Sequence, residues 1–183
     1  MTALRSITPT LFLSLAVSGC IGSYMYAKEM EGADRSLVFG YIDMRGTNTV
    51  LDTLSFVPND PKKKEDYTGA RVLGSALGGF EGSGPFFLEN MPSGSYRISH
   101  FVSRIGQFGY THIFPESGPR AQVFKIDRPG IYFLGSYKVA RKDREFDFRP
   151  VKSPTQKEIL EQILPYTKDT KWENLIRKRL REL

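Results

Sequence analysis

The sequence predicts a mainly β protein: an antiparallel β-sandwich of about seven to nine strands with a C-terminal α-helical pair. Short runs rich in β-branched and aromatic residues recur between residues 37 and 149, and Gly, Pro, Asn and Asp separate them. No amphipathic helical pattern interrupts these runs, which argues against a parallel α/β sheet. After Pro150 the apolar residues take helical spacing instead.

The N-terminal residues 1–19 have the pattern of a secretory signal peptide. Arg5 is the only basic side chain before an apolar run from Ile7 to Val17. An apolar stretch of about 7–15 residues followed by small residues is typical of such a signal, whereas a membrane-spanning helix needs about 20. The segment Val17-Ser18-Gly19-Cys20 resembles the lipobox of bacterial lipoproteins, which implies cleavage between Gly19 and Cys20.

Cys20 is the only cysteine, so it can form no intrachain disulfide. The resemblance implies that its thiol forms a thioether with a diacylglycerol and that its new amine is acylated, for example with palmitate. Several acyl chains give stable membrane anchoring. Residues 21–22 lack the Asp that resembles an inner-membrane retention signal, so we expect the outer membrane, on its periplasmic face or at the cell surface. An ordinary signal peptide near a chance cysteine and an uncleaved anchor are the alternatives.

In residues 20–36 the apolar residues show no clear helical or strand periodicity, and we expect this segment to be a tether between the lipid and the domain. The sandwich domain is expected over residues 37–150. Its expected strands are Leu37–Asp43, Val50–Val57, Ala70–Leu73, Pro85–Glu89, Ser95–Ser103, Tyr110–Phe114, Ala121–Ile126, Ile131–Val139 and Glu145–Arg149. The charge run 61–66 and the glycine-rich segment 74–84 are expected to be loops.

The C-terminal segment, residues 151–183, predicts two helices. Ser153, Pro154 and Gln156 fit an N-cap, a first helical position and a capping-box glutamine. The first helix is expected to end at Pro165, and Thr170 to Glu173 repeats the capping-box pattern. The apolar stripes of the two helices are Ile159, Leu160, Ile163 and Leu164 in the first, and Trp172, Leu175, Ile176 and Leu180 in the second.

The segment 87–96, Phe-Leu-Glu-Asn-Met-Pro-Ser-Gly-Ser-Tyr, resembles a recurrent hairpin of carboxypeptidase-regulatory-like (transthyretin-like) β-sandwiches. In this reading Phe87, Met91 and Tyr96 enter the core, while Pro92 and Gly94 set the turn. A second block, residues 129–135, also has the form of a turn and a core strand, and the pair of blocks is similar to small β-sandwich lipoproteins. The resemblance implies a binding or assembly module and transfers no catalytic residues.

Candidate residues for chemistry are few. His100 and His112 lie in expected strands, and a metal site would need a third ligand such as Glu89 or Glu116. No ligand-spaced cluster marks such a site, so we expect no metal and no cofactor. Ser99 and Ser103 lie close to His100, but no G-x-S-x-G elbow of a serine hydrolase occurs. The glycine-rich segment lacks the pattern of a phosphate-binding loop.

The net charge of +6 is concentrated in residues 138–183, whereas acidic and basic residues balance from residue 20 to 137. This neutral body argues against nucleic-acid binding. The sharpest basic cluster comprises Arg177, Lys178, Arg179 and Arg181. It is a candidate contact for an anionic partner, either lipid headgroups or an acidic protein, and the alternative is a solvated helix face.

We therefore expect a lipid-anchored, non-catalytic protein of the cell envelope that binds an envelope partner through the loops of its sandwich. Two alternatives remain at this point. One is a periplasmic or surface enzyme with a site near His100 and His112, and the other is a purely structural subunit of a larger envelope assembly.

Overall fold

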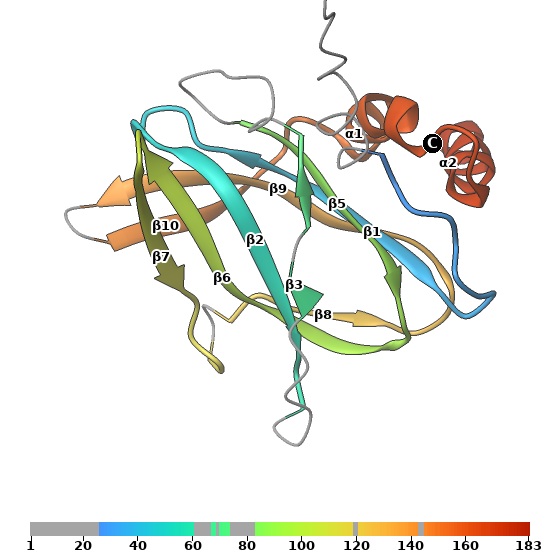
Figure 1. Ribbon diagram of the computed structural model, residues 1–183, viewed down its shortest axis with the longest axis horizontal. Helices are drawn as coiled ribbons and strands as arrows, with labels where there is room; N and C mark the ends of the chain where they lie inside the picture. Colours follow the sequence, from blue (N-terminus) through green and yellow to red (C-terminus); the bar gives the residue numbers. More distant parts are fainter. Residues whose placement is uncertain (1–25, 61–66, 69, 74–82, 119–120, 143–144) are drawn as a thin grey trace, which may run out of the picture.

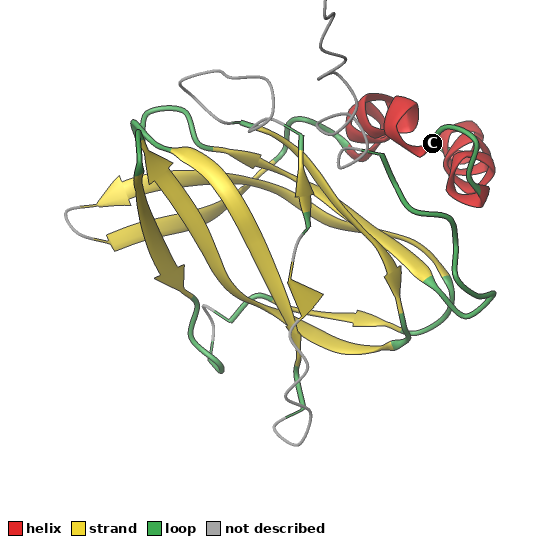
Figure 2. Ribbon diagram, in the orientation of Figure 1, coloured by secondary structure: helices red, strands yellow, loops and turns green. Residues whose placement is uncertain are grey.

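The structure, a computed structural model, describes residues 26–60, 67–68, 70–73, 83–118, 121–142 and 145–183. These residues form a mainly β protein with two sheets and two C-terminal α-helices, as expected (Figures 1 and 2). The signal peptide and Cys20 lie outside the described residues, as do the expected loops apart from Ser83 and Gly84. Among the described helices, none has the length and apolar character needed to cross a membrane.

Every expected strand overlaps a strand of the structure, and the short β3 was not expected. The strands are β1 (Ser36–Asp43), β2 (Val50–Pro58), β3 (Tyr67–Thr68), β4 (Arg71–Val72), β5 (Gly84–Met91), β6 (Gly94–Ile105), β7 (Phe108–Ile113), β8 (Val123–Ile126), β9 (Gly130–Lys142) and β10 (Glu145–Val151). They are followed by α1 (Gln156–Ile163), the 3-10 helix η2 (Leu164–Thr167) and α2 (Lys171–Glu182).

The first sheet has the strand order β10-β9-β1-β5-β4, and the second has the order β3-β2-β6-β7 with β8 also paired to β6. The expectation of purely antiparallel pairing is wrong at one place, because β1 and β9 are parallel. A parallel pair requires a long connection. Here that connection includes the whole second sheet, a relation between distant segments that no local sequence pattern shows.

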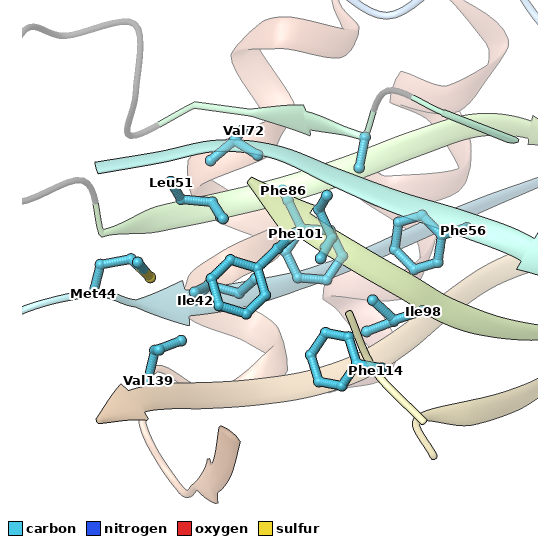
Figure 3. Close-up of a cluster of buried hydrophobic side chains, with 12 residues drawn as sticks. Ile42, Met44, Leu51, Phe56, Val72, Phe86, Ile98, Phe101, Phe114 and Val139 are labelled. Carbon is cyan, nitrogen blue, oxygen red and sulfur yellow. The ribbon is translucent and has the colours of Figure 1, made fainter. Parts of the chain in front are cut away.

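The two sheets share a buried cluster of apolar side chains (Figure 3). Ile42 and Phe86 enter it from the first sheet, and Phe56 and Ile98 enter it from the second. The rings of Phe56 and Phe86 are 6.2 Å apart between centroids. Complete burial of each such side chain contributes about 1.5–3 kcal/mol, so this cluster is a main source of the fold's stability.

The strand β1 is buried on both faces. Leu37 and Phe39 lie in the cluster beneath the helices, whereas Ile42 lies in the cluster between the sheets. Successive side chains of a strand point to opposite faces. Because α1 and α2 cover the outer face of the first sheet, β1 is apolar on both sides and its sequence shows a continuous apolar run.

The helical pair packs on the outer face of the first sheet through Ile159, Ile163, Trp172 and Ile176, all fully buried. The contacts include Phe87 of β5, so this residue of the expected hairpin points toward the helices. Met91 and Tyr96 form part of a separate buried cluster with Val38 and Ile126.

The helix starts differ in detail from the expectation. The N-cap of α1 is Thr155, two residues after the expected Ser153. Glu158 accepts a hydrogen bond from the Thr155 amide at 2.6 Å, and its own amide donates to the Thr155 hydroxyl, so the capping box closes on this pair. Thr170 is the N-cap of α2 as expected, but its hydroxyl donates to the Thr167 carbonyl at 2.6 Å and makes no capping box.

Residues 26–31, which we call the N-terminal strap, are fixed to the folded body, although the sequence predicts a tether over 20–36. The amide of Ala27 donates to the carbonyl of Tyr166 at 2.7 Å, and the indole N–H of Trp172 donates to the carbonyl of Lys28 at 3.1 Å. Further hydrogen bonds join Glu29 and Glu31 to Asn90, at 3.1 and 2.9 Å. These partners are far away in sequence, so local composition could not reveal the packing.

Candidate functional site

The end of the β6–β7 hairpin exposes three large apolar side chains. Ile105, Phe108 and Tyr110 are 41%, 73% and 48% exposed, and we call them the β6–β7 tip. Ile105 pairs with Phe108 and Ser103 pairs with Tyr110, so the tip lies on the same sheet face as the buried Phe101. Along β6, Phe101 and Ser103 are buried and Ile105 is exposed. The core face of the second sheet therefore continues into solvent at this end.

The β6–β7 turn lies near one end of the long axis of the molecule, and α1 and α2 lie at the other end (Figure 1). The start of β2 is beside the turn, because Val50 pairs with Arg104. Ile113 is 82% exposed, but it is the last residue of β7, at the end away from the turn and on the opposite face, so it is not part of the tip. A group of exposed apolar side chains on one part of a protein surface is typical of an interaction site. This end of the second sheet is therefore the candidate binding surface.

The buried Ser103 and the half-buried His112 form a polar pair beside the tip. The Oγ atom of Ser103 and the Nε2 atom of His112 are 2.9 Å apart. The imidazole packs against Phe101 and Phe146, with ring centroids at 4.5 and 4.1 Å. Burial lowers the pKa of His112, which favours the neutral ring. The hydrogen bond satisfies a hydroxyl that the core would otherwise leave unpaired.

The two histidines point to opposite sheet faces. His112 pairs with Phe101 and shares its sheet face, whereas His100 immediately precedes Phe101 on β6, so the side chain of His100 lies on the other face. There its Nδ1 atom is 3.0 Å from the Ser99 hydroxyl. The structure therefore does not bring His100 and His112 together as a site.

The acidic residues considered as metal ligands have other partners. Glu116 forms an ion pair with Arg97 at 3.0 Å, and Glu89 accepts a hydrogen bond from the Lys28 amide at 3.1 Å. In the part of the chain that the structure describes, no group of three or more His, Cys, Asp or Glu residues could hold a metal ion.

The pair Ser103 and His112 resembles two members of a hydrolytic triad, in which a third, acidic group orients the histidine. Ser103 is fully buried, so its hydroxyl cannot reach a substrate in this arrangement. Within the described ranges, the hydrogen bond of His112 is to Ser103 and not to a carboxylate. The geometry fits a hydrogen-bonded core histidine.

A cluster of hydrogen bonds around Asp43 joins the end of β1 to the start of β5. The carboxylate of Asp43 accepts hydrogen bonds from the Ser83 hydroxyl and from the Arg45 amide, each at 2.9 Å. The guanidinium of Arg45 also pairs with it at 2.8 Å and holds the pKa of Asp43 well below its usual range. Because Asp43 is buried and fully engaged, we assign this cluster to holding the β1–β2 connection in place.

The structure divides the basic cluster that the sequence suggests as a contact for an anionic partner. Arg177 pairs with Glu173 at 2.8 Å, and Arg179 pairs with Glu182 at 3.2 Å. Lys178 and Arg181 are exposed. The run is therefore not a single surface of four unpaired charges.

The hairpin at residues 87–96 has the burial that the sequence predicts. Met91 and Tyr96 are buried, and the Tyr96 hydroxyl donates to the Pro92 carbonyl at 2.8 Å across the turn. None of the family models, curated proteins or solved structures compared with this chain matches it. The resemblance to carboxypeptidase-regulatory-like domains thus depends on the two sequence blocks alone.

Sequence reasoning missed the β6–β7 tip. The expected strands end at Ser103 and resume at Tyr110, which left Ile105 and Phe108 in a turn. A signal was present, since two large apolar residues flank Gly106-Gln107. Apolar residues beside a tight turn extend the hairpin, and in this hairpin they extend it beyond the shared core.

Proposed function

We propose that this chain is a lipid-anchored, non-catalytic protein of the cell envelope that acts as a binding or assembly module. Cys20 is the proposed lipid attachment site, exposed as the new N-terminus by cleavage after Gly19, and the proposed location is the outer membrane. The proposed fold of the body is a β-sandwich similar to carboxypeptidase-regulatory-like domains, with β1 and β9 as a parallel exception.

The observation that carries this proposal is that the N-terminal strap and the exposed tip lie at opposite ends of the molecule. The strap is bound beside α2 and η2, and the exposed β6–β7 tip lies at the opposite end of the long axis (Figure 1). Tyr26 follows Cys20 by six residues, which can span at most about 20 Å. An anchor at Cys20 would hold the helical end near the membrane and direct the tip toward a partner.

Replacement of Cys20 by serine tests the anchor. We expect Cys20→Ser to abolish labelling by radioactive palmitate and to release the protein from washed membranes, because a hydroxyl cannot form the thioether. A Ser18→Ala variant keeps a small residue in the lipobox and is the matched control. Normal membrane retention and unchanged processing of Cys20→Ser would refute the lipoprotein assignment.

Site-specific cross-linking tests the binding surface. A photo-reactive amino acid at Phe108, in the tip, is expected to give a discrete cross-linked product in intact cells, because the exposed apolar surface contacts a partner. The same probe at Ile113 is the control, since this position is 82% exposed, more than the 73% of Phe108, but lies on the opposite face of β7. Identical products from both positions, or none from position 108, would contradict a partner surface at the tip.

The hydrogen bond between Ser103 and His112 is the one observation that favours a second candidate, an envelope enzyme with a site near these residues. The burial of Ser103 makes us prefer the binding module. A double variant, His100→Ala with His112→Ala, separates the two. An enzyme requires loss of function in a deletion-complementation assay at normal protein abundance, whereas the binding module predicts that function is kept.

A further inference from the structure

We infer that the solvent-facing side of α2 binds the headgroups of anionic lipids, an inference that depends on the proposed anchor at Cys20. Lys171, Lys178 and Arg181 are exposed along this side, with the neutral Asn174 between them. We call these three basic residues the basic stripe. A period of 3.6 residues places them on one helix face, and Trp172 lies on the buried face.

Within the described residues, the basic side chains of α2 that form no ion pair are the three of the basic stripe. Arg177 and Arg179 are each engaged by a glutamate on the same helix, as described above. No ion pair of Lys171, Lys178 or Arg181 occurs within the described residues. The structure thus shifts the candidate surface from the run 177–181 to residues spaced along the whole helix.

The strap brings the proposed anchor close to this helix. The ring of Tyr26 lies 6.2 Å from the ring of Tyr166, and the amide of Lys171 donates to the Glu29 carboxylate at 3.3 Å. From Lys171 to Arg181 the helix rises about 15 Å. The six residues from Cys20 to Tyr26 span at most about 20 Å. The whole stripe is therefore within reach of the bilayer that would hold the lipid.

This proximity favours a lipid surface over an acidic protein as the occupant, because the anchor holds headgroups beside the helix at high local concentration. Each basic side chain near an anionic membrane strengthens binding by roughly fivefold. Glu29 and Asp169 are exposed near Lys171, and their negative charges reduce the contribution of Lys171 to membrane binding. Lys178 and Arg181, farther along the helix, are expected to contribute most.

Sedimentation with lipid vesicles tests the inference. Residues 20–183 with Cys20→Ser contain every contact described here and carry no lipid, so binding by the stripe is measured without the anchor. We expect this protein to sediment with phosphatidylcholine vesicles that contain phosphatidylglycerol and not with pure phosphatidylcholine, and added salt should release it. The triple variant K171Q/K178Q/R181Q should bind at least about tenfold more weakly.

The control variant K125Q/R128Q/K138Q removes three exposed basic residues from β8, β9 and the turn between them. It loses the same charge and should retain most of the binding. Absence of binding to the anionic vesicles, equal binding to neutral vesicles, or equal losses in the two variants would overturn the inference. The Cys20→Ser labelling experiment has a separate readout, so failure of the stripe leaves the anchor proposal standing and the reverse also holds.

Discussion

Trp172→Ala is expected to destabilise the protein by about 3–5 kcal/mol and to release the N-terminal strap. The indole is fully buried among Phe39, Phe87 and Ile159, so its loss leaves a large cavity between the helices and the first sheet. The same side chain donates a hydrogen bond to the carbonyl of Lys28. One substitution therefore removes a core residue and a bond that holds the strap.

Trp172→Phe separates the two contributions. Phenylalanine keeps much of the packing but cannot donate the hydrogen bond, so we expect a loss of about 1–2 kcal/mol. Urea unfolding followed by circular dichroism gives the free energies. Hydrogen exchange at the amides of Ala27 and Glu31, which bond to Tyr166 and Asn90, reports on the strap. A change below about 1 kcal/mol in Trp172→Ala would show that the helices contribute little to the fold.

The sequence predicted the strands and the helical pair well because their signals are local. Turn residues such as Pro92 and Gly94 mark where strands end, and the spacing of Ile159, Leu160 and Ile163 is that of one helix face. The N-cap of α1 was misplaced by two residues. Both Ser153-Pro154 and Thr155 fit a helix start. The helix begins after Thr155 because Glu158 forms the two hydrogen bonds of the capping box with that residue.

The features that escaped prediction all depend on distant partners. The strap at residues 26–31 is polar in sequence, and its order comes from Asn90, Tyr166 and Trp172. The candidate site shows the same limit. Alternation along single strands could not show whether His100 and His112 share a face, because this depends on the register of β6 against β7.

Gly40→Ala is the second substitution with a large expected effect, about 3 kcal/mol of destabilisation. A Cβ atom on Gly40 would lie 2.6 Å from the ring of Phe86 and 2.8 Å from the carbonyl oxygen of Gly135. Phe86 is locked in the cluster between the sheets, and the carbonyl belongs to β9. Neither can move without disturbing a neighbouring strand of β1.

Gly109→Ala provides the matched control, because the Cβ at this strand position would meet only a methyl group of Val102 at 3.8 Å. We expect its free energy of unfolding to stay within about 0.5 kcal/mol of the wild type, or to rise slightly because alanine restricts the unfolded chain. Urea unfolding of both variants is the measurement. Equal stabilities would mean that β1 can shift away from Phe86 and Gly135.

The position of Gly40 explains why its effect should be large. β1 is hydrogen-bonded to β5 on one side and to the parallel β9 on the other, with a register shift in the β1–β9 pair between Phe39 and Tyr41. The missing side chain at Gly40 lets the Phe86 ring and the β9 backbone approach β1 at this shift. An added methyl group would push on both partners, and through β1 on the outer face that carries the helices and the strap.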